Sequence, residues 1–142
     1  MTQKPEVCYE MLIPSYVTDM DARDATLLGK ELMRHPRVVT QEDLMMSAKE
    51  RCIYTARVKH DDPSKRGRIV GMASMVIIYR PISGPKALIE DVVVLKCFQG
   101  KSKGRTLMER LIALAKTKEW EVHAAWLTSS KSPRENSGAQ NV

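Results

Sequence analysis

The sequence is poor in aromatic residues and has no long apolar run, and both absences limit what it can do. Only 5% of its 142 residues are aromatic, with a single Phe, so we expect no base-stacking platform for single-stranded nucleic acid. No apolar run reaches the ~18 residues that a membrane-spanning helix requires. The N-terminus lacks the apolar core and cleavage site of a signal peptide. We therefore expect a cytoplasmic protein with no membrane partner.

Cysteine and histidine are also sparse. Cys8, Cys52 and Cys97 are widely separated, and the three histidines are equally scattered. Neither set has the paired spacing of a zinc site, so no metal is expected. The three cysteines are interpreted as buried free thiols in a reducing compartment.

What the sequence does have is a concentrated positive charge. Apolar residues make up 43% of the chain, enough for one globular domain over residues 1–142, and the net charge is +6. Residues 95–118 carry seven basic side chains against Glu109, which equals the net charge of the whole chain. This concentration predicts a local site for an anion. It also raises the alternative of nucleic-acid binding, but no recognition motif accompanies it, so no nucleic-acid partner is expected.

Hydrophobic periodicity and turn residues predict an α/β order of elements. Thr40 is the expected N-cap of a short helix, and Asp19 or Asp21 of the helix before it. The expected strands are 7–14, 52–59, 68–80, 87–95 and 121–129, and the expected helices are 19–35, about 40–48, 105–118 and one starting near Pro133.

A basic, glycine-containing loop joins the strand 87–95 to the helix 105–118. Such a strand–loop–helix junction binds anions, because the first backbone N–H groups of the helix are unpaired and the helix dipole is positive there. Lys101, Lys103 and Arg105 add full charges. A nucleotide-triphosphate loop of the Walker type is excluded, because only three residues separate Gly100 from Gly104 and no Lys follows them.

The same loop resembles the coenzyme-binding motif of the GNAT family of N-acetyltransferases. The family pattern is Arg or Gln, two residues, Gly, one residue, then Gly or Ala, and Gln99, Ser102 and Gly104 occupy those positions. The preceding run, 89–94, is similar to the family's central strand, especially in glucosamine-phosphate N-acetyltransferases. The order of elements matches over roughly residues 7–142.

The resemblance implies an α+β fold with a mixed, mostly antiparallel sheet flanked by helices. It implies transfer of an acetyl group from acetyl-CoA to a small-molecule or protein amine in one ternary complex; the alternative is a non-catalytic acetyl-CoA-binding or regulatory module. Homodimers are common in the family, so a homodimer stays open. The coenzyme-binding residues implied are Val92, Val93, Val94, Gln99, Gly100, Lys101, Ser102, Lys103, Gly104 and Arg105.

The amine must lose a proton before it attacks, so a nearby carboxylate is needed. Glu90 and Asp91 are the candidate catalytic residues. They should alternate to opposite faces of the strand, so only one can face the substrate, and Glu90 is slightly favoured. The run 90–94 hints at an amino-sugar phosphate as the acceptor.

Three departures from the family pattern are visible. Ser102 stands where Gly is usual and fits if its φ is negative, and Lys103 stands where an apolar residue is usual. The sequence ends at Val142, where a Tyr-containing segment would begin, so the last strand or strands and the family's usual general acid are expected to be missing. A fragment, a naturally short member and a chain completed by a partner all remain open.

Overall fold

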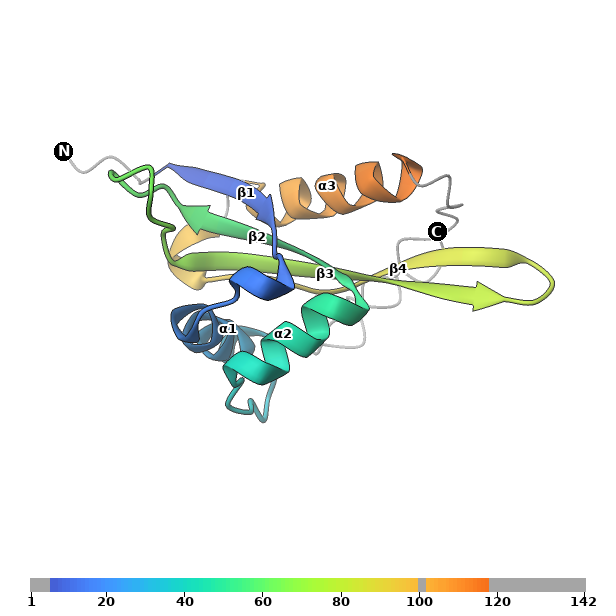
Figure 1. Cartoon of the computed structure of the whole chain (residues 1–142), viewed down its shortest axis with the longest axis horizontal. Helices are drawn as coiled ribbons and strands as arrows, with labels where there is room; N and C mark the ends of the chain where they lie inside the picture. Colours follow the sequence, from blue (N-terminus) through green and yellow to red (C-terminus); the bar gives the residue numbers. More distant parts are fainter. Residues whose placement is uncertain (1–5, 100–101, 118–142) are drawn as a thin grey trace.

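The computed structural model describes residues 6–99 and 102–117 (Figure 1). The order of elements predicted over this part is confirmed, whereas the strand expected at 121–129 and the helix expected near Pro133 lie outside the described residues. The elements are β1 (Val7–Met11), η1 (Pro14–Tyr16), α1 (Asp19–Leu32), α2 (Gln41–Glu50), β2 (Cys52–Val58), β3 (Ile69–Arg80), β4 (Gly84–Val94), η2 (Lys96–Phe98) and α3 (Lys103–Thr117).

The described strands form one antiparallel sheet in the order β1-β2-β3-β4, which gives the mixed α+β fold. Helix α3 covers one face of the sheet, and helices α1 and α2 cover the other (Figure 1). The β3–β4 hairpin is the longest pairing, and its turn extends beyond the other strands (Figure 1). Because apolar residues line both faces of β3, this strand can be covered on both sides.

Helix α3 packs closely on the sheet because the strand beneath it carries a glycine. Leu107 and Leu111 are fully buried, and a Cβ at Gly71 would lie 3.3 Å from Leu107 Cδ1. A side chain at Gly71 would therefore crowd Leu107 and require it to shift. On the opposite face, Leu44 and Ile53 belong to a second apolar cluster that joins α2 to the sheet.

Thr18 caps helix α1, so the prediction of Asp19 or Asp21 as the N-cap was wrong. The Thr18 hydroxyl accepts from Asp21 N at 3.1 Å, and the Asp21 carboxylate accepts from Thr18 N at 3.2 Å. The acidic residue thus supplies the second half of a capping box. The same reciprocal pair, Thr40 with Asp43, begins α2 as the sequence predicts.

A buried arginine holds α1 on the sheet. The Arg57 side chain is 2% exposed and pairs with Asp21 at 2.8 Å and with Glu10 at 2.9 Å. Asp24, also on α1, accepts a hydrogen bond from Ile69 N at 2.9 Å. Burial raises the pKa of Asp24, and the Ile69 N–H opposes that rise. These contacts fix the helix that forms one wall of the site described below.

The described residues also show how exposed the cysteines are and whether metal-ligand clusters or membrane-spanning helices occur among them. Cys8 and Cys97 are exposed and Cys52 is half-buried, so the prediction of buried thiols was wrong for two of the three. Among the described residues, no cluster of His, Cys, Asp and Glu is arranged to hold a metal ion. None of the described helices is long and apolar enough to cross a membrane.

Candidate active site

A β-bulge in β4 shapes the centre of the candidate site. Ser74 pairs with Glu90 and Met72 pairs with Val93, so Ala73 alone faces two residues of β4. Asp91, the first of those two, has a φ of 53°, a conformation that Asp tolerates better than most residues. A bulge interrupts the alternation of side chains and re-aims one of them.

The bulge corrects the expectation that Glu90 and Asp91 lie on opposite faces. Asp91 lines a cavity on the α1–α2 side of the sheet, and Glu90 is paired with Arg51, which lines the same cavity. After the bulge the alternation resumes, since Val93 lines the cavity while Val92 lies beside Gly104 of α3. Both candidate carboxylates therefore lie close to one cavity.

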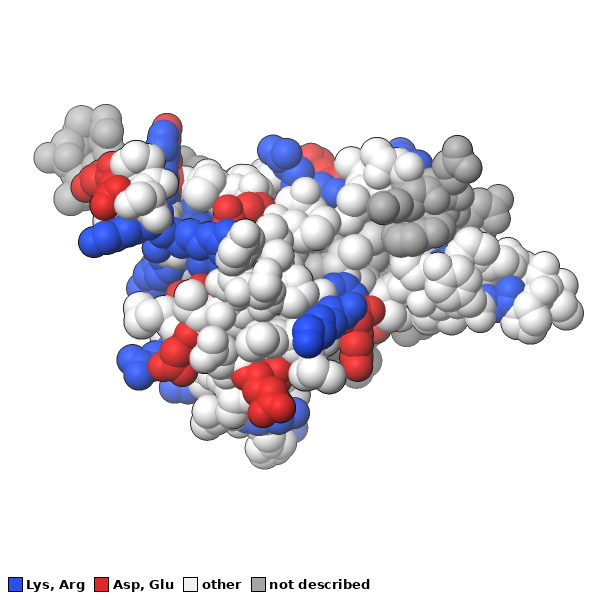
Figure 2. All heavy atoms as spheres, viewed as in Figure 1, with Lys and Arg blue, Asp and Glu red and all other residues white. Residues whose placement is uncertain are grey.

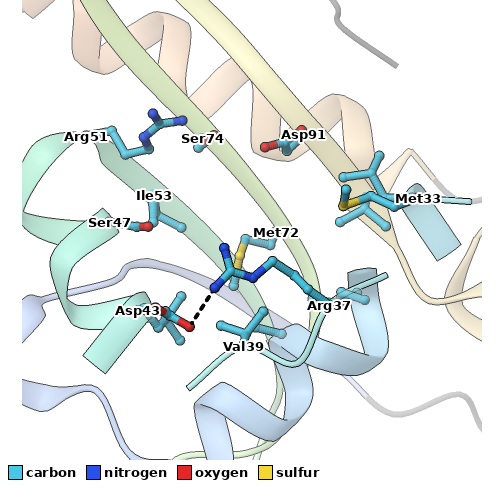
Figure 3. A pocket seen from close by; sticks show the side chains of 15 residues that line it. Met33, Arg37, Val39, Asp43, Ser47, Arg51, Ile53, Met72, Ser74 and Asp91 are labelled. Atoms are coloured by element: carbon cyan, nitrogen blue, oxygen red, sulfur yellow. Dashed lines mark hydrogen bonds and ion pairs between the residues drawn. The ribbon is translucent and has the colours of Figure 1, made fainter. Parts of the chain in front are cut away.

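The cavity measures about 290 Å³ and lies between α1, α2 and strands β2 to β4 (Figure 3). Its apolar walls include Leu28, Leu32, Met33, Val39, Leu44 and Met72. Its polar lining residues are Arg37, Asp43, Ser47, Arg51, Ser74 and Asp91. A concave apolar site with a few convergent polar groups is typical of small-molecule binding.

The two carboxylates of β4 have different surroundings. Glu90 Oε2 lies 3.3 Å from Arg51 Nη1, and both side chains are about a quarter to a third exposed. Asp91 has no ion pair or hydrogen bond to another side chain among the described residues. The pKa of Asp91 is raised, first by partial desolvation in the cavity and then by the Glu90 charge, while the Arg51 charge opposes the rise. Asp91 is thus more easily protonated than an ordinary aspartate.

The predicted phosphate loop follows β4 and is tied back to it. Gln99 Nε2 donates to Val94 O at 2.9 Å, so this side chain anchors the loop to the end of the strand. Gly100 and Lys101 lie outside the described residues. Ser102 O accepts from Thr106 N at 2.9 Å, and α3 therefore begins at Lys103, two residues earlier than predicted.

Ser102 adopts a φ of 61°, so the negative φ under which a serine would fit without strain is not met. This is the left-handed region, in which a residue with a Cβ is strained and glycine is not. Ser102 retains the conformation of the loop at a cost in backbone strain.

The start of α3 and the end of β4 lie side by side. A Cβ on Gly104 would lie 3.6 Å from Val92 Cγ1 and 4.0 Å from Val94 Cγ2. Lys103, Gly104 and Arg105 form the first turn, where backbone N–H groups have no carbonyl four residues earlier within the helix. The structure thus brings together the strand and the helix start that the sequence predicts for a phosphate-bearing coenzyme.

Two contributors to this site were not predicted from the sequence. Arg51, the C-cap residue of α2, is 39 residues from its partner Glu90. Ser74 Oγ donates to Glu90 O at 3.2 Å from the neighbouring strand. Neither residue lies in a recognisable motif, and only the strand register brings them to Glu90.

In this fold a bulged strand leads through a short loop into the basic first turn of a helix. The sequence matches the Acetyltransferase (GNAT) family over residues 14–139, and the chain belongs to this family. No curated protein sequence gives a significant match.

Solved structures agree with the fold. An acetyltransferase from Trypanosoma brucei is 24% identical with a TM-score of 0.65, and the alignment covers 89% of this chain and 84% of that one. Glucosamine-6-phosphate N-acetyltransferase from Arabidopsis thaliana is 20% identical with a TM-score of 0.66, covering 96% and 89%. An aminoglycoside acetyltransferase from an uncultured soil metagenomic sample, in complex with trehalose, is 16% identical with a TM-score of 0.69, covering 95% and 85%.

Proposed function

We propose that this protein is an N-acetyltransferase that moves an acetyl group from acetyl-CoA to a primary amine within a ternary complex. Family membership supports acetyl transfer in general, and enzymes of this family generally use acetyl-CoA. The observation that carries the proposal is the position of Asp91. This residue lines the cavity and directly precedes the strand segment, Val92–Val94, that meets the start of α3.

The helix start fits the pyrophosphate of the coenzyme. Lys103, Gly104 and Arg105 offer first-turn N–H groups, two cationic side chains and a position without a side chain. Ser102 is a further proposed ligand, as are Gly100 and Lys101, which lie outside the described residues, while the Gln99 side chain anchors the end of the described segment to Val94 O. The segment Val92–Val94 would lie along the pantetheine arm, and a backbone N–H of this strand would polarise the thioester carbonyl.

We propose Asp91 as the general base, in preference to Glu90. Arg51 holds the Glu90 carboxylate in an ion pair, whereas Asp91 lines the cavity without such a partner among the described residues. A base with a raised pKa accepts a proton from an ammonium more readily than an ordinary aspartate does. Glu90 then keeps a supporting role, because its charge contributes to that rise.

The proposed reaction begins with deprotonation of the amine. The ammonium transfers a proton to Asp91, directly or through a water molecule, and the neutral nitrogen attacks the thioester carbon. A C–N bond forms and the C–S bond breaks. The second proton lost from the attacking nitrogen passes to the departing thiolate, directly or through water, so the products are the N-acetylamine and the free thiol of the coenzyme. The tetrahedral intermediate carries its negative charge on the former carbonyl oxygen, where a strand N–H stabilises it by about 3 kcal/mol.

Two measurements on the full chain test this function. Isothermal titration should show binding of acetyl-CoA at or below millimolar concentration, and a thiol-release assay should show turnover with primary amines. Failure to bind acetyl-CoA at millimolar concentration would refute the proposal. Binding without turnover over a broad amine panel would instead identify a non-catalytic coenzyme-binding module.

A further inference from the structure

We infer that the cavity beside Asp91 takes the acceptor, and that this acceptor is a small apolar primary amine, either an alkylamine or an arylalkylamine. The inference rests on the proposed function, because it names the acceptor of the same reaction. It depends on three features of the cavity: its walls, the state of its charged groups and its size.

The walls of the cavity are mainly apolar. Nine of its 15 lining residues are apolar, and they come from both helices and from the strands beneath. Leu28 and Ile53 are almost fully buried, and Leu44 is 4% exposed, so these walls belong to the packed core and keep their shape. A ligand body in contact with them gains from each apolar group that it removes from water.

The charged groups of the cavity are already paired, with one exception. Arg37 Nη2 lies 3.3 Å from Asp43 Oδ2 at the rim, and Arg51 is held by Glu90. Within the part of the chain that the structure describes, Asp91 is the lining carboxylate that has no cationic partner within ion-pair distance. The cavity therefore offers one free negative group and apolar walls, which complements an ammonium on an apolar body (Figure 3).

An amino sugar does not complement this arrangement. Each hydroxyl that enters the cavity without a hydrogen-bond partner lowers affinity by about tenfold. A sugar phosphate would also need a cation for its phosphate, and both arginines of the cavity already have carboxylate partners. A polycationic aminoglycoside would place additional ammonium groups against apolar walls. The short similarity of residues 90–94 to amino-sugar-phosphate enzymes therefore does not extend to the chemistry of the cavity.

The size of the cavity sets the scale of the ligand. At about 290 Å³ it lies near the lower end of ligand pockets, which suits an amine with a chain of several carbons or one aromatic ring. Each methylene that enters apolar surroundings contributes about fourfold in affinity. The specificity constant should then increase along a series of linear amines until the cavity is filled.

The test is a comparison of kcat/KM by thiol release for propylamine, butylamine, pentylamine, hexylamine and phenethylamine against glucosamine 6-phosphate and an aminoglycoside. We expect kcat/KM to rise about fourfold per methylene through the series. We expect the two sugar amines to be at least about 100-fold poorer than hexylamine, since each would place several hydroxyls against the apolar walls.

A matched pair of variants links this preference to the cavity. Met33 lines the cavity and is 45% exposed, whereas Met46 lies on α2 outside the cavity and is 48% exposed. Met33→Asn should lower kcat/KM for hexylamine several-fold and flatten the chain-length series. Met46→Asn should leave kcat/KM for hexylamine and the chain-length series unchanged. A similar loss of kcat/KM in the two variants would show that the cavity is not the acceptor site.

The outcomes separate this inference from the proposed function. Turnover that favours glucosamine 6-phosphate or the aminoglycoside would overturn the apolar acceptor and leave the acetyltransferase function intact. Binding of acetyl-CoA with no turnover of any amine would overturn both. A chain-length series that rises in the wild type and flattens in Met33→Asn alone would support both.

Discussion

Arg51 and Glu90 form an ion pair of 3.3 Å between the end of α2 and the fourth strand. The pair lies beside Asp91, whose pKa is raised by partial burial and by the Glu90 charge, while the Arg51 charge opposes the rise. One residue of β4 is therefore held by a cation while its neighbour is left to face the cavity.

Replacing Asp91 should affect turnover much more than replacing Glu90. Asp91→Asn removes the proposed base, and we expect kcat to fall by about 10²- to 10³-fold, as for the loss of a general base. The pH dependence of kcat/KM should show an acid limb in the wild type, since Asp91 must be ionised to accept a proton. The midpoint of that limb should lie above the ordinary aspartate pKa, and the limb should disappear in Asp91→Asn.

Glu90→Gln is the matched control, because it keeps the shape of the neighbouring side chain and the bulge. It should change kcat by less than about tenfold and should move the acid limb to lower pH, since a negative charge beside Asp91 is removed. The opposite order of effects would make Glu90 the base.

Arg51 should act through the pKa of Asp91. Arg51→Gln removes the positive charge that opposes the rise, so the pKa of Asp91 should increase and the acid limb should move to higher pH. Arg51→Lys should restore most of the wild-type profile, because it restores the charge. An Arg51→Gln variant with reduced kcat and an unshifted profile would assign Arg51 a structural role alone.

Ser102→Gly should stabilise the phosphate loop. Because Ser102 has a φ of 61°, glycine relieves backbone strain of about 1 kcal/mol. We expect a higher free energy of unfolding in urea and tighter binding of acetyl-CoA by titration. Ser102→Val, with a β-branched side chain that resists a positive φ, should change both in the opposite direction. Equal stabilities of all three proteins would contradict the strained loop.

At position 104 we expect the charge of a new side chain, and not its size, to decide whether acetyl-CoA still binds. A Cβ at this position would make ordinary contacts, the shortest being 3.6 Å, so Gly104→Ala should fold normally and retain coenzyme binding. Gly104→Glu adds a negative charge to the first turn of α3, beside the proposed pyrophosphate position, and we expect the Kd for acetyl-CoA to rise at least about 100-fold. Equal binding of acetyl-CoA by the two variants would show that the pyrophosphate does not bind at this helix start.

The sequence predicted most of the fold because its elements have strong local signals. The Val-rich strand 87–95, the Thr40–Asp43 cap and the apolar face of the helix after the loop each depend on residues a few positions apart. The boundaries were less accurate, since Thr18 caps α1 and α3 begins at Lys103. Such details depend on backbone angles that residue type alone does not determine.

The site was predicted in part. The sequence predicted the strand, the loop and the two candidate carboxylates together because they form one continuous motif, and the described members lie side by side in the structure. The β4 bulge at Asp91 was not foreseen, because no glycine or proline marks it and Asp itself tolerates the conformation. Arg51 is 39 residues from Glu90 in the chain, and such a pairing arises only from tertiary packing.

The central claim is that Asp91 and the cavity it lines form the reaction centre of an acetyl-CoA-dependent N-acetyltransferase. The most direct measurement incubates the wild type and Asp91→Asn with acetyl-CoA and hexylamine and quantifies N-acetylhexylamine by mass spectrometry alongside released coenzyme. We expect one acetylated amine per free thiol in the wild type. An Asp91→Asn protein that still binds acetyl-CoA should form at least about a hundredfold less N-acetylhexylamine. Equal product formation by the two proteins would contradict the central claim.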